Sequence, residues 1–245
     1  MPLKNGREAV GHFFFMYKLI GTNFETSLHR ELKFLFCGYE GQTEVEIGGY
    51  VADGINEQGE IVEVQIGNLG PLKNKVKEFA ANNKVRVIHP VIITKYIEVY
   101  DCKGNKLYRR KSPRRGCPWD IFNALIYAPD LPLVPNLTIT LAMVDIVEKR
   151  LDDGKGSWRR KGLSIKDRNL MELREKICLK SLKDYLQFLP FKKRESFTSS
   201  LLAQRASLNN DLARKTIYVL FRVGLIKRIG KDKKAWIYKI CQTTK

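Results

Sequence analysis

The stretch YVADGINEQGEIVEVQI, residues 50–66, decides the fold of this chain. An extended, apolar-rich run already begins at Val45, and Gln58-Gly59 interrupts it with residues typical of a tight turn. The pattern predicts two strands, one on either side of this turn, that pair as a hairpin. In such a hairpin Asp53 and Glu63 lie near each other.

The approach of Asp53 and Glu63 raises a question of charge. Two neighbouring carboxylates repel each other unless one is protonated or a divalent cation lies between them. Because side chains alternate along a strand, Glu63 and Gln65 share one face of theirs. A plain structural interpretation also exists: Glu63 and Gln65 form the polar outer face of a half-exposed strand, and Asp53 is a turn residue before Gly54. The sequence leaves both interpretations open.

A helix is expected before the hairpin, over residues 22–37. At ~100° per residue, Glu25 falls within the apolar stripe that contains Leu28 and Leu32. A carboxylate on that stripe calls for a cation or hydrogen-bond donors. Thr22 and Glu25 also have the spacing of a capping box, which gives Glu25 a purely structural alternative.

The rest of the first part predicts alternating helices and strands. Pro71 opens a helix at a position that proline tolerates, and a strongly β-branched strand begins at Val85. We therefore expect an α/β (α+β) fold, a mixed sheet flanked by helices. The expected strands are 45–55, 61–66, 85–94 and 137–147 with a hairpin over 97–108, and the expected helices are 22–37, 71–80, 118–127 and 169–178.

The order of these elements and of their polar residues resembles the PD-(D/E)XK nuclease superfamily, which includes restriction endonucleases and Holliday junction resolvases. The resemblance covers residues 21–94, with Glu25 on a helix, Asp53 on a strand, and Glu63 and Gln65 on the next strand. It implies a restriction-endonuclease-like sheet in which Glu25, Asp53 and Glu63 bind one or two divalent metal ions.

The chain departs from the family pattern at two positions: Gln65 stands at the family's lysine, and Ala52 rather than proline precedes Asp53. The resemblance implies hydrolysis of phosphodiester bonds with Mg²⁺ or Mn²⁺, which lowers the pKa of a bound water and neutralises charge on the phosphate. We expect Gln65 to orient the attacking water as a member of the catalytic set. Lys73 or Lys75, in the following helix, is a candidate source of positive charge.

Positive charge is concentrated in the last quarter of the chain. The formal net charge is +18, and residues 180–245 carry 16 Lys and Arg against 4 Asp and Glu. Such an excess indicates a polyanionic partner, with nucleic acid as the first candidate and an anionic membrane surface as the second. No apolar run reaches the ~18 residues of a bilayer span. We expect DNA as the partner, double-stranded, and no membrane.

The C-terminal segment predicts three helices, 182–189, 197–206 and 209–223, followed by two strands around a lysine-rich tip. This order resembles the winged helix-turn-helix family, which implies that the third helix enters the major groove and that the wing contacts phosphate or the minor groove. A solvated charged helix, or a protein-binding one, is the alternative. The implied DNA-binding residues are Arg214, Lys215, Tyr218 and Arg222 on the helix, and Lys231, Lys233 and Lys234 on the wing.

Two basic loops of the first part, 109–115 and 156–166, are candidates for clamping the phosphate backbone. Their arginines are Arg114, Arg115, Arg159 and Arg160. Exposed basic loops without a ligand are common, so the clamp and the ordinary loop both remain open.

Together these patterns predict a nuclease-like domain over 1–175 and a winged-helix domain over 176–245. The expected function is that of a Mg²⁺-dependent deoxyribonuclease, a homodimer if it cuts both strands. The alternatives are a non-catalytic DNA-binding protein or transcription regulator on a degenerate nuclease scaffold, and an RNA-processing enzyme. Five scattered cysteines without a CxxC pair, and no signal-peptide layout, predict a cytoplasmic protein.

Overall fold

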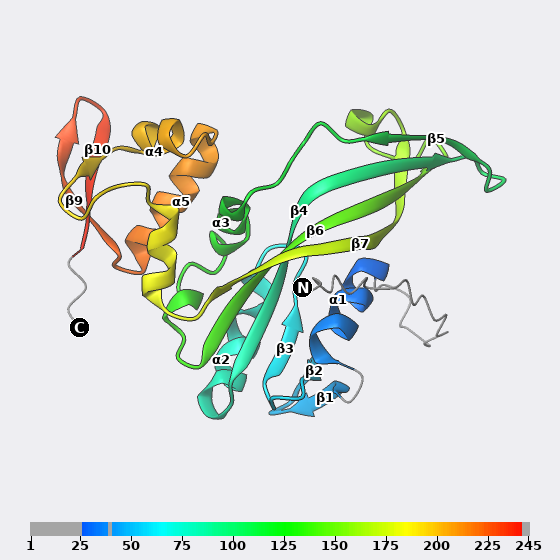
Figure 1. Ribbon diagram of the computed structural model, residues 1–245, viewed down its shortest axis with the longest axis horizontal. Helices are drawn as coiled ribbons and strands as arrows, with labels where there is room; N and C mark the ends of the chain where they lie inside the picture. The colour runs from blue at the N-terminus through cyan, green and yellow to red at the C-terminus, as the bar shows by residue number, and fades with distance from the viewer. Residues whose placement is uncertain (1–25, 39–40, 242–245) are drawn as a thin grey trace, which may run out of the picture.

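A computed structural model describes residues 26–38 and 41–241 of the chain. In this part a seven-stranded mixed sheet carries helices on both faces, and a smaller unit of helices with a three-stranded sheet follows it (Figure 1). The predicted class, a mixed sheet flanked by helices, is confirmed. Among the described residues, no helix has both the length and the apolar character needed to cross a bilayer.

The predicted hairpin forms at one edge of the large sheet, but the single strand expected over 45–55 is two strands, because Gly48 and Gly49 form a turn with positive φ. Asn56 closes the turn of the predicted hairpin, because the side-chain oxygen of Asn56 accepts hydrogen bonds from the backbone N–H groups of Gln58 (3.1 Å) and Glu60 (2.9 Å). The second strand ends at Val64, two residues before the expected end. The antiparallel strands of this edge are β1 (Gln42–Ile47), β2 (Tyr50–Ile55) and β3 (Ile61–Val64).

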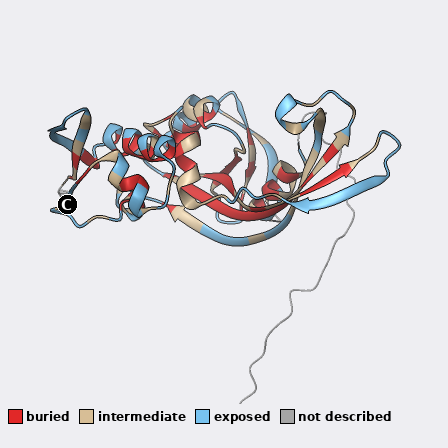
Figure 2. Cartoon of the chain, turned by 90° about the horizontal axis from the view of Figure 1, so that it is seen from above, coloured by how far each residue is buried: buried red, intermediate tan, exposed pale blue. Residues whose placement is uncertain are grey.

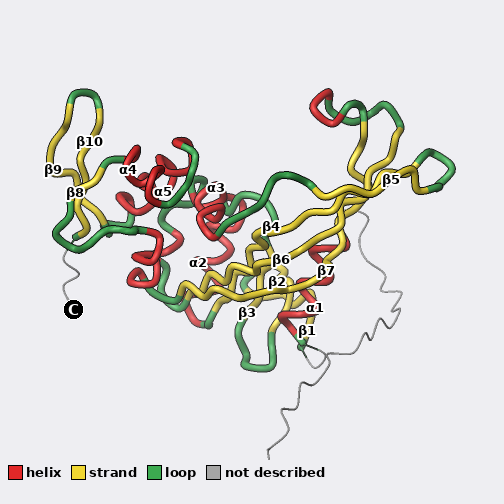
Figure 3. The backbone as a smooth tube through the Cα atoms, turned by 45° about the horizontal axis from the view of Figure 1, so that its top comes forward, coloured by secondary structure: helices red, strands yellow, loops and turns green. Residues whose placement is uncertain are grey.

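Three long strands form the centre and the other edge of the sheet. β3 pairs parallel with β4, β4 parallel with β6, and β6 antiparallel with β7, while β5 returns along the distal half of β4. At ~3.3 Å per residue, strands of 16 and 17 residues span about 50 Å. The β4–β5 and β6–β7 hairpins therefore project together from one end of the sheet (Figure 3). The strands are β4 (Val85–Tyr100), β5 (Lys106–Lys111), β6 (Leu137–Asp152) and β7 (Leu163–Leu179).

The expected helix over 169–178 is wrong, because these residues belong to β7. A β-bulge disturbs the alternation of side chains in this strand. Ile146 pairs with Leu170 and Val144 with Leu173, and the register shift between them brings two leucines three residues apart onto the face below α1. A spacing of three imitates one turn of helix, so the sequence pattern is misleading here.

Helices cover both faces of the sheet. On one face α1 packs Leu28 and Leu32 against a core that includes Val62 and Val64, and Thr26 is its N-cap. Glu25 and Thr22 lie outside the described residues. On the other face α2 follows a short 3₁₀ helix. The helix predicted over 118–127 is confirmed in part as α3, which also follows a 3₁₀ turn. The elements are α1 (Ser27–Cys37), α2 (Lys73–Asn82) and α3 (Ile121–Leu125), with 3₁₀ helices Gly70–Leu72, Pro118–Asp120 and Leu131–Leu133.

The three C-terminal helices and the hairpin appear in the predicted order, but the second helix begins at Ser199, because Ser196–Phe197 form a strand that was not predicted. The first helix is a 3₁₀ helix, Leu182–Phe188, and the next two begin at side-chain caps from Thr198 and Asn209. The small sheet has the order β8-β10-β9, with a hairpin at its end. Its elements are β8 (Ser196–Phe197), α4 (Ser199–Arg205), α5 (Asn210–Arg222), β9 (Ile226–Asp232) and β10 (Ala235–Ile240).

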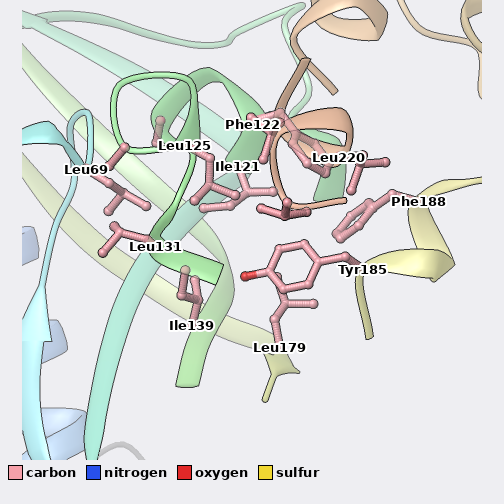
Figure 4. Close-up of a cluster of buried hydrophobic side chains, with 14 of the residues drawn as sticks. Leu69, Ile121, Phe122, Leu125, Leu131, Ile139, Leu179, Tyr185, Phe188 and Leu220 are labelled. Atoms are coloured by element: carbon pink, nitrogen blue, oxygen red, sulfur yellow. The ribbon is translucent and has the colours of Figure 1, made fainter. Parts of the chain in front are cut away.

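One hydrophobic core joins the C-terminal elements to the large sheet. Phe188 packs edge-on against Phe122 of α3 (Figure 4). The indole N–H of Trp119 donates to the carbonyl of Phe188 at 3.1 Å. Buried residues continue from the sheet into the C-terminal helices, whereas β5 is exposed along its length (Figure 2). β7 runs to Leu179, and the division into domains at 175/176 stays a prediction.

Candidate functional site

Asp53 and Glu63 lie where β2 and β3 separate. Backbone pairing between the strands stops at Gly54 and Val62. Beyond that point the Oδ2 atom of Asp53 accepts from the backbone N–H of Val64 (2.7 Å), and Oε1 of Glu63 accepts from the backbone N–H of Asp53 (3.2 Å). Each carboxylate thus satisfies a backbone donor that the separated strands leave without a partner. The proximity expected from the hairpin is present.

Glu63 is a buried carboxylate with a cation beside it. Its side chain is 3% exposed, and the Nζ atom of Lys75 lies 2.7 Å from its carboxylate. Burial and the charge of Asp53 raise the pKa of Glu63, and the ion pair with Lys75 opposes that rise. Lys75 comes from α2, on the far side of the strand from α1. Of the two lysines suggested by the sequence, Lys75 enters the cluster, while Lys73 lies 3.6 Å from Asp130.

Asp53 has the opposite balance. Burial disfavours its charge, but hydrogen bonds from His29 and from the backbone of Val64 outweigh burial, so the pKa of Asp53 lies below its usual value. The Nε2 atom of His29 is 2.9 Å from the carbonyl oxygen of Val64 and 3.4 Å from Oδ2 of Asp53. Because a carbonyl only accepts, Nε2 carries a proton. Sequence reasoning missed His29, whose partner Val64 lies 35 positions away with no shared motif.

Asp53 and Gln65 open into a cleft of about 550 Å³. The side-chain amide of Gln65 donates to the carbonyl of Asn68 (2.8 Å), which orients the amide and leaves its oxygen as an acceptor. His89 fixes the backbone behind it, since its Nδ1 donates to the carbonyl of Gln65 at 2.7 Å. The cleft is lined by Thr26, His29, Lys33, Glu44, Val51, Ala52, Asp53, Gln65, Ile66 and Gly67.

The described residues provide part of a ligand set for a hard cation. No hydrogen bond from this part of the chain reaches Oδ1 of Asp53, and carboxylate oxygens are the ligands that Mg²⁺ prefers. Across residues 26–38 and 41–241, no group of three or more His, Cys, Asp or Glu side chains could hold a metal. In this part of the chain Asp53 offers Oδ1, whereas the carboxylate of Glu63 already accepts from the backbone N–H of Asp53 and from Lys75. Glu25, the third expected ligand, lies outside the described residues.

The expected recognition helix has an exposed face, but part of that face is engaged. Arg214 and Tyr218 are exposed on α5. Lys215 instead donates to Asn123 of α3 (3.0 Å) and pairs with Asp211 of its own helix (2.6 Å), and Arg222 lies 3.4 Å from Asp130.

The β9–β10 hairpin carries Lys231, Lys233 and Lys234 as exposed residues. It also holds Arg228, a residue that sequence reasoning missed. The Arg228 guanidinium lies 4.6 Å from the ring centre of Phe221 and 4.4 Å from that of Trp236. Of the basic-loop residues, Arg114 and Arg115 are exposed after β5, and Arg159 and Arg160 lie in the β6–β7 turn.

The comparisons with known proteins cover most of this architecture. Residues 26–180, from the N-cap of α1 to the end of β7, match a family model described as a domain of unknown function, DUF8091. The chain belongs to the DUF8091 family. An uncharacterized protein of Treponema pallidum (strain Nichols) is 33% identical over 185 residues, which is 76% of this chain and 74% of the relative. No solved structure matches the chain. The DUF8091 segment contains the whole Asp53–Glu63–Lys75 cluster.

Proposed function

We propose that the chain is a Mg²⁺- or Mn²⁺-dependent endonuclease that hydrolyses phosphodiester bonds in double-stranded DNA. The observation that carries the proposal is the cluster of Asp53, Glu63 and Lys75 beside an open cleft. A mixed sheet with a helix, three antiparallel strands, a second helix and a parallel fourth strand supports a restriction-endonuclease-like fold. The proposed fold and the proposed activity rest on the same resemblance.

In this proposal Asp53 and Glu63 hold the metal, and Glu25 keeps its predicted role as a third ligand. The metal supplies a bound water of lowered pKa and positive charge at the scissile phosphate. Lys75 holds Glu63 in place at 2.7 Å, and its ammonium group brings positive charge next to the metal site. The oxygen of Gln65 accepts a hydrogen bond from the attacking water and orients it.

In this proposal the C-terminal elements form a winged helix that binds the DNA. α5 presents Arg214 and Tyr218, and the β9–β10 hairpin presents its lysines and Arg228. Contacts to phosphate provide most of the affinity of such modules and make binding sensitive to salt. The shared core around Phe188 fixes these contacts relative to the sheet.

The test is cleavage of plasmid DNA by the full chain with Mg²⁺ or Mn²⁺. We expect Asp53→Asn and Glu63→Gln to abolish nicking and to preserve duplex binding. Glu78→Gln is the matched control, because Glu78 is an exposed acid on α2. Metal-dependent nicking by the Asp53→Asn, Glu63→Gln double variant would refute the assignment.

A non-catalytic DNA-binding protein is the second candidate, and one observation favours it. The ion pair with Lys75 already neutralises Glu63, and a neutral Gln65 stands at the family's lysine position. Tight duplex binding by the wild-type chain without nicking of any DNA form would select this candidate. A preference for structured RNA would instead indicate an RNA-processing enzyme.

A further inference from the structure

The turn between β6 and β7 presents a tryptophan at the projecting end of the sheet. Trp158 is 83% exposed, more than any other large hydrophobic side chain in the described residues. It opens a short 3₁₀ helix, and three cations follow it directly, Arg159, Arg160 and Lys161. Figure 3 shows this short helix as a red turn beyond the ends of the strands.

The turn is held by its own hydrogen bonds. The N–H of Gly156 donates to the carbonyl of Gly162 at 2.7 Å, and the side-chain Nε of Arg160 donates to the carbonyl of Leu163 at 3.2 Å. A Cβ at position 156 would lie 1.9 Å from the Leu163 carbonyl oxygen, so only glycine fits there. The geometry of this tight turn therefore fixes Trp158 in an exposed position.

A basic cleft lies between the β4–β5 turn and the β6 and β7 strands that lead into the Trp158 turn. It has a volume of about 550 Å³ and contains Lys103, Lys149 and Lys166, none of which makes an ion pair with a described residue. Two acids also line it, but their oxygens are engaged: Asp101 accepts from the turn around Asn105, and Asp167 accepts from Ser27 at the start of α1. Three lysines against two acids give the lining a net charge of +1, so the cleft offers its lysines to a polyanion.

We propose that this turn and cleft bind DNA that carries unpaired bases, with Trp158 stacked on one such base and the three lysines of the cleft at phosphates further along the DNA. The inference rests on the proposed function, in which DNA is the substrate, and it names the substrate class as DNA with an interrupted duplex. Bases within a continuous duplex have both faces covered, whereas an unpaired base has a free face for an aromatic ring. The Arg159 guanidinium lies 5.6 Å from the Trp158 ring centre and occupies one face, so the other face is available for stacking.

An anionic membrane is the competing partner for an exposed tryptophan among cations. Insertion of Trp158 would carry Arg159 and Arg160 toward the hydrocarbon region, at a high cost for charged groups. Its neighbours in the turn are serine, glycine and lysine, which add no apolar surface. A single aromatic ring flanked by cations fits nucleic acid better than lipid.

The experiment measures binding by the full chain, in the absence of divalent metal, to a DNA duplex with a central bulge of unpaired nucleotides and to the same duplex fully paired. Trp158→Ala is expected to weaken binding to the bulged duplex by about 5- to 150-fold, the equivalent of one lost base stack at ~1–3 kcal/mol. Binding to the paired duplex is expected to change by less than about twofold, and Trp158→Phe is expected to retain most of the affinity. Tyr127→Ala, at a 64% exposed aromatic in the loop after α3, is the control.

The outcomes separate this inference from the proposed function. Unchanged binding of the bulged duplex by Trp158→Ala, or an equal loss on both duplexes, would refute base stacking and leave the proposed nuclease standing. Failure of the wild-type chain to bind either duplex would overturn both. Binding to phosphatidylserine vesicles that Trp158→Ala abolishes would assign the turn to membranes. Trp158 is exposed, so thermal unfolding of Trp158→Ala is expected to match that of the wild type.

Discussion

Phe188→Ala is expected to destabilise the whole molecule, because Phe188 joins the C-terminal elements to the large sheet. Its side chain is 1% exposed, and its ring centre lies 5.0 Å from that of Phe122, 5.6 Å from Trp119 and 6.4 Å from Tyr185. Truncation of a buried phenylalanine costs about 3–5 kcal/mol. Edge-to-face pairs add about 0.5–1.5 kcal/mol beyond burial, so we expect the upper half of that range, about 4–5 kcal/mol.

Urea unfolding measures the loss in free energy of unfolding, and calorimetry measures the change in Tm. Leu133→Ala is the control. Leu133 is 48% exposed, and its truncation is expected to change the free energy of unfolding by no more than about 0.5 kcal/mol. At about 2–4 °C per kcal/mol for a chain of this size, Phe188→Ala lowers Tm by about 8–20 °C. Because one core runs from Ala52 to Ile240, a single transition is expected to shift as a whole. Two transitions of which only one shifts, or a loss of about 1 kcal/mol or less, would refute the reasoning.

Three further predictions concern charge. Glu63→Gln mimics the protonated acid: because the pKa of Glu63 is raised above 4.5 on folding, the stability that its bound proton contributes is lost as pH rises through the folded pKa. The Tm of Glu63→Gln minus the Tm of the wild type is therefore expected to increase from acidic to neutral pH in thermal scans. A Tm difference that is the same at both pH values would contradict this. Lys75→Met raises the pKa of Glu63 further, so the acid limb of a pH–cleavage profile is expected to move to higher pH, whereas Lys77→Met, an exposed lysine of the same helix, leaves it in place. Arg214→Gln is expected to reduce the slope of log K against log salt for duplex binding by about 0.9, and an unchanged slope would remove Arg214 from the phosphate contacts.

The edge of the sheet was predictable because its signals are local. The turn at 56–60 and the apolar alternation on either side of it fix the register of β2 and β3, and this register places Asp53 beside Glu63. The apolar stripes of α1 and α5 likewise depend on residues three and four positions apart, whereas the N-cap of α1 is Thr26 and not the expected Thr22. Physical chemistry within one short segment is enough for such features.

The features that the sequence missed depend on distant partners. β7 gains its strand from pairing along the whole of β6, and its bulges hide the period of two on which a strand prediction depends. His29 meets Val64 only because α1 crosses the sheet at that point. The engagement of Arg222 with Asp130 likewise follows from the docking of α5 on the loop after α3. No periodicity within one segment carries such information.

The position of the cation in the candidate site bears on how many metal ions it takes. The lysine of this site is at position 75 on α2 and not at position 65 on the strand, so its positive charge reaches Glu63 from the side of α2. The carboxylate of Asp53, whose pKa is lowered, lines the cleft. With Glu25 in its proposed role, Glu25, Asp53 and Glu63 against Lys75 give the cluster a net charge of −2. Under the proposed function one divalent cation balances this charge, so a site built around one metal ion leaves no excess charge before DNA binds.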